Sequence, residues 1–382
     1  MAKSVRYHYP EMKRFLDDAF VRFGFSGEEA AQITDVLLLS DLYGIASHGL
    51  QRLVRYHKCI KNGMIKIGAE PELVFETPVS AVIDAHDGMG QLVSVKAMNL
   101  AIEKAKKTGI AIVTVRNSNH YGIAGYYAKM ACDQGLIGMS VTNTTALMVP
   151  TFGKKAMLGS NPIAVSMPAE PYPFFFDSST TVVTRGKLEM YNKMGKDMPI
   201  GWAVDENGIA TEEAPRVLRN IDDKAGGGIL PLGGHTEQLG SHKGYGYAML
   251  CEIFSSIVSL GKTSNHTYEK GKCEVCHGFA AIDPNIFGNA EEIKEYLSDF
   301  LRELREAPKA DGQERIYTHG EKEVEAYKDR MENGWDVNIN TVLEMKNLCD
   351  DLGMDWKEYL GEVDFSDANK NMYEQRIGGI KV

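Results

Sequence analysis

The hydrophobic pattern between residues 91 and 142 switches repeatedly from helical spacing to continuous apolar runs, and this alternation constrains the fold most. Residues 91–107 predict an amphipathic helix, because apolar side chains recur on one face: Val95, Met98, Ala101, Ile102 and Ala105. Residues 110–115 indicate a buried strand, and a helix over 125–134 and a strand over 137–142 follow. Helix and strand units in succession predict an α/β fold in which helices cover a sheet.

Helical patterns dominate both ends of the chain. Pro10 begins one helix, and Ser26 with Glu29 forms a capping box at the start of a second. A third helix is expected over 48–63. From Ala290 onward the pattern is again charged and helical.

The middle of the chain alternates short strands with turns. We expect strands over 72–76, 80–85 and 278–283. The stretch 224–246 is rich in glycine and proline, so it is expected to be the longest loop.

Composition excludes several classes of protein. The 382 residues are 43% hydrophobic and 25% charged, as in an ordinary soluble protein large enough for two or three structural parts. A formal net charge of -10 argues against general affinity for nucleic acid or anionic membranes. No apolar run is long enough to span a bilayer, and the first ten residues lack the apolar core of a secretory signal. We therefore expect a cytoplasmic protein whose six cysteines are reduced.

Two histidine motifs carry the chemistry. One is Ser47-His48-Gly49-Leu50-Gln51-Arg52, and the other is Asn117-Ser118-Asn119-His120-Tyr121-Gly122. An imidazole titrates near neutral pH and can donate a proton, and a guanidinium can hold a carboxylate through two parallel hydrogen bonds. Arg52 lies four residues after His48, so on one helix the two side chains would share a face. A lone histidine is nevertheless more often a hydrogen-bonded structural residue, and most arginines lie on the surface.

The segment Cys273-Glu274-Val275-Cys276-His277 matches the pattern of c-type haem attachment. Haem attachment requires export, and a zinc site would need a second ligand pair at matching spacing. We therefore interpret this segment as a loop with two free thiols and predict no metal site.

A nucleotide-binding fingerprint is absent in its usual form. Gly88-Met89-Gly90 and Gly244-Tyr245-Gly246 each supply only half of the G-x-G-x-x-G pattern. The chain is thus either not a nucleotide enzyme, or one that binds the nucleotide without a Rossmann loop.

A family resemblance resolves this choice. The two histidine motifs, together with further motifs in the same order, resemble the malate/L-lactate dehydrogenase family that is unrelated to the Rossmann-fold enzymes of those names. This family also includes sulfolactate, ureidoglycolate and 2,3-diketogulonate enzymes. The further motifs are Thr142-Asn143-Thr144, Gly159-Ser160-Asn161-Pro162-Ile163-Ala164, Asp177-Ser178-Ser179-Thr180-Thr181, Arg185-Gly186-Lys187-Leu188-Glu189, Gly201-Trp202-Ala203-Val204-Asp205 and His242-Lys243-Gly244-Tyr245-Gly246.

The resemblance implies a non-Rossmann α/β fold with a mixed sheet, in which the N- and C-terminal helices form one part. We expect residues 1–75 and 290–382 to form a helical domain, and 76–289 to form a mixed-sheet cofactor-binding domain. It also implies a homodimer and a nicotinamide cofactor, NAD or NADP. The cofactor residues that we predict are Asn143, Thr144, Ser160, Asn161, Phe175, Phe176, Asp177, Ser178, Ser179, His242, Lys243, Gly320, Glu321 and Lys322.

The catalytic residues that we predict are Ser47, His48, Arg52, His120 and Asp177. Reduction of a 2-oxo acid needs a proton at the carbonyl oxygen, and either histidine could supply it. The adjacent Arg52 favours His48, and His120 would then polarise the carbonyl or bind the nicotinamide ribose. Ser47 could cap a helix or bind substrate, and Asp177 could orient a histidine, bind a ribose or occupy a turn.

The sequence thus predicts an NAD(P)-dependent 2-hydroxyacid dehydrogenase that acts on a small-molecule substrate. Malate and oxaloacetate are the preferred pair, and L-lactate and pyruvate, or another substrate of the family, are the alternatives. A metal-dependent hydrolase built on the histidines and on Cys273 and Cys276 is the alternative from another class.

Overall fold

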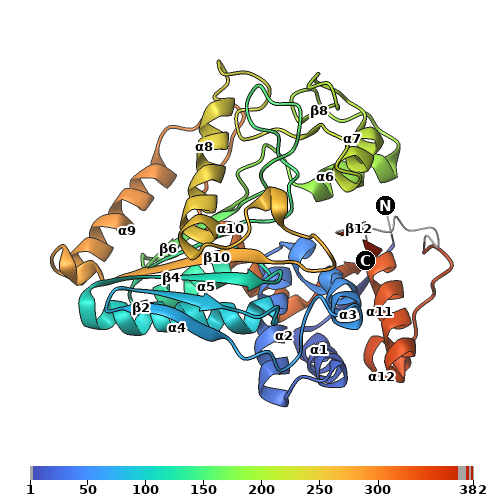
Figure 1. Ribbon diagram of the computed structural model, residues 1–382. Coiled ribbons are helices and arrows are strands. Elements are labelled where there is room, and N and C mark those ends of the chain that lie inside the picture. Colours follow the sequence, from blue (N-terminus) through green and yellow to red (C-terminus); the bar gives the residue numbers. More distant parts are fainter. Residues whose placement is uncertain (1–2, 369–375, 378–379, 382) are drawn as a thin grey trace.

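A seven-stranded sheet forms the centre of the computed structural model, which describes residues 3–368, 376–377 and 380–381 (Figure 1). Its strands, in order across the sheet, are β2 (Glu72–Thr77), β3 (Ser80–Asp84), β4 (Ile110–Ser118), β10 (Val275–Ile282), β5 (Ile137–Thr142), β6 (Ile163–Met167) and β7 (Phe174–Ser178). The β3–β4 pair is parallel, and all other neighbours are antiparallel. A Rossmann sheet is mostly parallel, so the predicted non-Rossmann α/β fold is confirmed.

Two layers cover this sheet. Helices α4 (Gly90–Thr108) and α5 (Ala124–Cys132) pack on one face, where their alanine-rich sides meet the buried Val113, Val115 and Phe279. Helix α8 (Ser241–Glu252) and the π-helical segment η3 (Ile253–Ile257) approach the other side. A Cβ at Gly278 would lie 2.0 Å from the carbonyl oxygen of Phe254, so this glycine permits the close approach of η3 to β10.

A helical layer joins the two ends of the described chain. It contains α1 (Tyr9–Phe23), α2 (Gly27–Leu42), α3 (Leu53–Lys61), α11 (Ile339–Leu352) and α12 (Trp356–Leu360). Strand β1 (Ser4–Tyr7) pairs antiparallel with β11 (Trp335–Asn338) and brings α11 to α1. Buried side chains from both ends then share one core, as Phe15 and Leu16 do with Val342 and Met345.

The remaining elements lie around these layers (Figure 1). Helices α6 (Arg185–Met194) and α7 (Ala214–Asp222) and the short pair β8 (Ala203–Val204) and β9 (Gly228–Ile229) enclose a separate small core. Helix α10 (Glu321–Asn333) packs on α2, and α9 (Ala290–Glu306) lies on the same side of the molecule as α8. A two-stranded pair, β12 (Arg376–Ile377) and β13 (Ile380–Lys381), forms near the C-terminus. Within the described residues no helix combines the length and apolarity needed to cross a bilayer.

Three sequence expectations need correction. The helix expected over 48–63 is interrupted, because Gly49 (φ -96°, ψ -133°) separates two short 3₁₀ turns, η1 (Ala46–His48) and η2 (Leu50–Arg52), from α3. The loop expected over 224–246 contains the short strand β9 and ends at Gly240, because α8 begins at Ser241. The strand expected over 278–283 spans Val275–Ile282 and so begins inside the paired-cysteine segment, residues 273–277. The reason is that Val275 pairs with Ser118 of β4 and His277 pairs with Thr142 of β5.

The sheet topology gathers the predicted site at one edge. Strands β4, β5 and β7 run parallel to one another, because β10 separates β4 from β5 and β6 separates β5 from β7, each antiparallel to its neighbours. Their C-terminal ends therefore lie at the same edge. His120 follows β4, Asn143 follows β5 and Ser179 follows β7.

Candidate active site

A buried carboxylate holds the loop that carries His48 and Arg52. Asp41, at the end of α2, is 3% exposed, and its Oδ2 accepts a hydrogen bond from the Leu50 amide at 2.7 Å. A Cβ at Gly49 would lie 2.1 Å from that oxygen, so only glycine permits this contact. The two turns η1 and η2 are thereby fixed on either side of Gly49. The backbone oxygen of Asp41 also accepts a hydrogen bond from Arg330 of α10.

The two predicted histidines meet across the helical and sheet layers. The His48 and His120 rings stack with centroids 5.5 Å apart and an interplanar angle of 23°. Both side chains are partly exposed, which leaves them accessible to a ligand. The separate motifs of the sequence thus form one site.

Each histidine uses Nδ1 to contact the protein. The Ser47 hydroxyl lies 2.8 Å from Nδ1 of His48, and the Tyr56 hydroxyl lies 2.6 Å from Nδ1 of His120. The Gly122 amide also donates to Nδ1 of His120 at 3.4 Å, so that nitrogen is an acceptor and the neutral ring carries its proton on Nε2. The Nε2 atoms are therefore the ones that this arrangement leaves for a substrate oxygen.

Positive charge accumulates around the pair. Burial, followed by the charges of Arg52 and Arg55, lowers the pKa of His48 to about 3. Burial and then the charge of Arg55 lower the pKa of His120 well below its ordinary value. Both rings are consequently neutral at pH 7 until a bound anion offsets the arginines.

Arg52 and Arg55 come from successive turns at the start of α3. Arg52 Nε donates to the Ser47 carbonyl oxygen at 2.6 Å, and Arg55 Nη2 donates to the Tyr268 hydroxyl at 2.8 Å. Across the described residues neither guanidinium forms an ion pair with a carboxylate. Glu189 exerts a charge effect on Arg52, but its carboxylate is bonded to Arg185 at 2.9 Å. Burial and the neighbouring Arg55 lower the pKa of Arg52 to about 10.

Asp177 lies at a helix start, apart from the histidines. Its Oδ2 accepts a hydrogen bond from the Gly125 amide at 2.7 Å, at the beginning of α5. Burial raises the pKa of Asp177 to about 6. In the described chain no hydrogen bond joins Asp177 to His48 or His120.

Asn143 and Asn161 belong to a buried network below the sheet edge. Their amides donate to the Glu252 carboxylate at 3.3 and 3.1 Å, and Asn161 Oδ1 accepts from the Thr144 amide at 3.2 Å. The Thr144 hydroxyl in turn accepts from the Ser160 amide at 3.1 Å. These four predicted cofactor residues are thus brought together, with the two asparagine side chains facing protein groups.

The other predicted cofactor residues surround two uncapped helix starts. Helix α8 follows Gly240 and carries the exposed His242 and Lys243 in its first turn, without a side-chain cap. Helix α10 follows Gly320 and begins with Glu321 and Lys322, also uncapped. The Ser241, Lys243 and Glu321 amides already donate to backbone carbonyl oxygens. The exposed side chains of His242, Lys243 and Lys322 are therefore the groups at these helix starts that fit the phosphates of a dinucleotide.

Strand β7 lies beside the start of α10. A Cβ at Gly320 would lie 2.6 Å from the Pro173 carbonyl oxygen, and the Phe175 amide donates to the His319 carbonyl oxygen. Phe176 packs edge-on against His319. Ser178 ends the strand and Ser179 follows it, at the same sheet edge as His120. The Glu321 carboxylate is held by Arg315 and by the Thr318 amide.

The paired-cysteine segment is structural. Cys273 and Cys276 are buried free thiols that are 2% and 0% exposed, and burial raises the pKa of both to about 12. His277 uses both ring nitrogens, with Thr142 at 2.8 Å and Ser118 at 2.9 Å. The described residues contain no cluster of three or more potential metal ligands. This segment shapes the sheet edge, and its Cys273 carbonyl oxygen accepts a hydrogen bond from the Tyr268 amide at 3.0 Å.

Sequence reasoning missed Arg55, Tyr56 and Tyr268. Arg55 and Tyr56 lie three and four residues after Arg52, so helical spacing could have placed them near it. Tyr268 lies on a loop 213 residues from Arg55, and no local pattern indicates that contact.

Known proteins match this chain along most of its length. A malate/L-lactate dehydrogenase family profile matches residues 7–346. Malate dehydrogenase of Pyrococcus abyssi is 42% identical over 92% of this chain and 96% of its own length. L-sulfolactate dehydrogenase of Methanocaldococcus jannaschii is 37% identical over 91% and 97%. The crystal structure of malate dehydrogenase from Entamoeba histolytica superposes with a TM-score of 0.89 at 37% identity, covering 92% of this chain and 99% of that one.

Proposed function

The chain belongs to the malate/L-lactate dehydrogenase family and is a hydroxyacid dehydrogenase, and on that premise we propose that it interconverts malate and oxaloacetate. Enzymes of this family use nicotinamide cofactors. The observation that carries the proposal is the stacked His48–His120 pair beside a guanidinium, Arg52, that lacks a carboxylate partner in the described chain.

These residues supply what a 2-oxo acid requires. Arg52 binds the carboxylate that all such substrates share, and this orients the adjacent carbonyl towards the imidazoles. The anion offsets the arginine charges and raises the pKa of His48, so the ring can hold the proton that the carbonyl oxygen receives. Neutral His120, held by Tyr56, donates a hydrogen bond from Nε2 to the same oxygen. A bound nicotinamide cofactor supplies or accepts the hydride.

Cofactor binding is assigned to the sheet edge and the two helix starts. His242 and Lys243 of α8 would hold phosphate oxygens. The backbone at Gly320 and Glu321 and the side chain of Lys322 would contact the adenosine part beside Phe175–Asp177. Either NAD or NADP is compatible with these residues.

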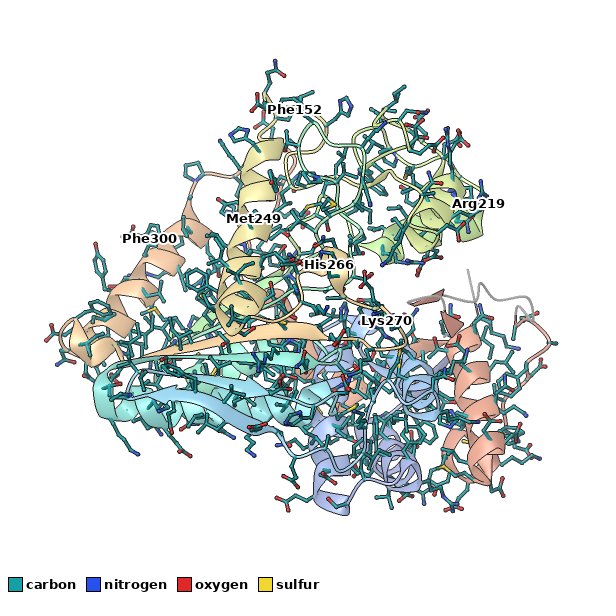
Figure 2. The ribbon with its side chains drawn as sticks, in the orientation of Figure 1. Phe152, Arg219, Met249, His266, Lys270 and Phe300 are labelled. Carbon is teal, nitrogen blue, oxygen red and sulfur yellow. The ribbon has the colours of Figure 1, made fainter. Side chains whose placement is uncertain are left out.

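A second copy of this chain is the proposed partner, and the cytoplasm is the proposed location. Large apolar side chains of α8, η3 and α9 are exposed on one side of the molecule, and Figure 2 labels Met249 and Phe300 among them. The most exposed of them are Tyr247, Leu250, Ile257, Tyr296 and Phe300, and Val258 and Leu260, which follow η3, are exposed as well. Large exposed apolar side chains on neighbouring elements are typical of a subunit interface.

A substrate panel tests the proposal. The purified protein is mixed with NADH or NADPH and then with oxaloacetate, 3-sulfopyruvate, pyruvate or 2,3-diketogulonate, and consumption of the reduced cofactor is recorded. Malate oxidation with NAD or NADP tests the reverse direction. We expect the highest kcat/KM with oxaloacetate. Failure to oxidise either cofactor with any of these acids would refute the proposal, and a preference for pyruvate would replace malate with lactate.

A further inference from the structure

Arg55 is a second positive charge at the site, and among the described residues it forms no ion pair with a carboxylate. It lies three residues after Arg52, so both side chains extend from the same side of the chain at the start of α3. Its Nη2 donates to the Tyr268 hydroxyl at 2.8 Å. The groups that surround it are Tyr56, Cys59, Tyr268 and Cys273, none of which is ionised at pH 7.

This arrangement costs free energy in the absence of a ligand. A partly buried guanidinium without an acidic partner loses hydration, and it repels the neighbouring Arg52. Arg55 also acts on both histidines through its charge, which places it within range of anything bound between them. An anion at Arg55 would offset both effects.

Tyr268 is held in place by a constrained segment. Its φ of 56° lies in the left-handed region, which an aromatic residue rarely adopts. The Tyr268 amide donates to the Cys273 carbonyl oxygen at 3.0 Å, and this bond closes the turn that presents the hydroxyl to Arg55. Figure 2 shows His266 and Lys270 on the same segment, which descends from the upper part of the molecule towards α3.

We propose that Arg55, oriented by Tyr268, binds a second anionic group at the far end of the substrate, so that the enzyme selects dianionic 2-oxo acids. This inference rests on the proposed function and deepens it. Arg52 holds the carboxylate next to the carbonyl, and Arg55 holds a carboxylate or a sulfonate on the methylene carbon. Oxaloacetate and 3-sulfopyruvate carry such a group, and pyruvate does not.

Substitution of Arg55 tests this assignment. Arg55→Met removes the charge and keeps a long side chain. We expect kcat/KM for oxaloacetate and 3-sulfopyruvate to fall roughly 10–100-fold further than kcat/KM for pyruvate does in the same variant, because any change at the histidines affects all three acids and only the dianionic acids lose a charge-assisted contact. Tyr268→Phe keeps the charge and removes its orienting bond, so we expect a smaller loss in the same direction. The ratio between the two dianionic acids reports whether the site prefers a carboxylate or a sulfonate.

Binding of non-reacting anions provides a measurement independent of turnover. Calorimetry with the reduced-cofactor complex compares succinate, a dianion with the carboxylate spacing of oxaloacetate, with propanoate, a monoanion. We expect Arg55→Met to weaken succinate binding at least about tenfold more than propanoate binding. Equal losses for both anions, or no loss for succinate, would overturn the role of Arg55. Wild-type protein that reduces no 2-oxo acid would instead overturn the proposed function.

Discussion

The side chains at this site carry an excess of positive charge that a bound anionic substrate would balance. Two neutral imidazoles lie beside two guanidinium groups, and the acidic groups described nearby are already bonded elsewhere. A bound 2-oxo acid brings the missing negative charge. Proton uptake by a histidine should therefore accompany substrate binding, because the anion raises the imidazole pKa.

Arg52 should not tolerate replacement by lysine. One ammonium cannot reproduce the two parallel hydrogen bonds of a guanidinium to a carboxylate. We expect Arg52→Lys to lower kcat/KM by roughly 10–100-fold for dianionic and monoanionic 2-oxo acids alike. Steady-state kinetics with oxaloacetate and pyruvate check this. Near-normal kcat/KM for both acids would show that the shared carboxylate binds elsewhere.

Asp41 should make stability depend on pH. Burial raises its pKa to about 7, against 3.8 for the free group, so between pH 4 and 7 the folded protein holds a proton that the unfolded chain releases. The carboxyl group therefore lowers stability as pH rises through this window. Asp41→Asn lacks this penalty. We expect the stability of Asp41→Asn relative to wild type to be higher at pH 8 than at pH 5, by on the order of 1–3 kcal/mol in the free energy of unfolding.

Denaturant unfolding at both pH values measures this difference. Asp177→Asn serves as a comparison, because burial raises the pKa of Asp177 only to about 6 and its effect should be smaller. An Asp41→Asn effect of equal size at pH 5 and pH 8 would mean that the carboxyl group does not titrate between them.

Spacing alone related Arg52 to His48, and the family resemblance was needed to predict that His48, Arg52 and His120 belong to one site. The partners that set their behaviour were not predictable, because they are distant in sequence. Tyr56 reaches His120 across 64 residues, and Tyr268 reaches Arg55 across 213. One expectation for Asp177 was that it orients a histidine, and in the structure its carboxylate accepts a hydrogen bond from the Gly125 amide at the start of α5.

At the scale of elements, periodicity predicted the pieces that bury one face. The helix expected over 91–107 is α4, and the strand expected over 137–142 has the observed bounds of β5. The break at Gly49 was not predictable, because it depends on a carboxylate eight residues earlier in α2 that takes the Leu50 amide from the helix. The pairing order of the sheet was also hidden, since β10 inserts between β4 and β5 from far along the chain.

Gly49 gives this element a direct test. In Gly49→Ala the new Cβ would meet the Asp41 carboxylate at 2.1–2.4 Å, so η1 or α2 must shift. We expect a loss of roughly 1–3 kcal/mol in stability and a fall in kcat/KM of at least about 100-fold, because His48 and Arg52 move together. Gly27→Ala, where a Cβ meets nothing within 4 Å, is the control and should change neither quantity appreciably. Unchanged activity in Gly49→Ala would show that the turn is not fixed by this contact.

At the scale of the whole molecule, the apolar side of α8, η3 and α9 is the feature that a monomer leaves unexplained. Helix α9 buries only Leu301 among its residues, although Tyr296 and Phe300 are 81% and 53% exposed. Burying this surface against a second copy would remove these rings from water.

Sedimentation analysis checks the dimer. Leu250, which is 43% exposed on α8, becomes charged in Leu250→Glu, and we expect this variant to sediment as a monomer while wild type sediments as a dimer. Val21→Glu is the matched control, because Val21 is 47% exposed on α1 in the helical layer. A monomeric wild-type protein would show that the proposed dimer does not form. A Leu250→Glu variant that remains dimeric would show that the interface lies elsewhere.

The pH dependence of oxaloacetate reduction measures whether the His48–His120 pair supplies the proton. In the wild type, kcat/KM should already decrease as the pH rises above about 3, the pKa of His48 in the free enzyme. The corresponding decrease in kcat should occur at higher pH, because the bound anion raises the pKa of His48. His48→Asn should abolish the decrease of kcat with rising pH and lower kcat by about 10²–10⁴. His120→Asn should keep this decrease and weaken substrate binding. If the decrease of kcat with pH is unchanged in His48→Asn and lost in His120→Asn, the roles of the two residues are reversed. If the decrease persists in both variants, neither histidine supplies the proton.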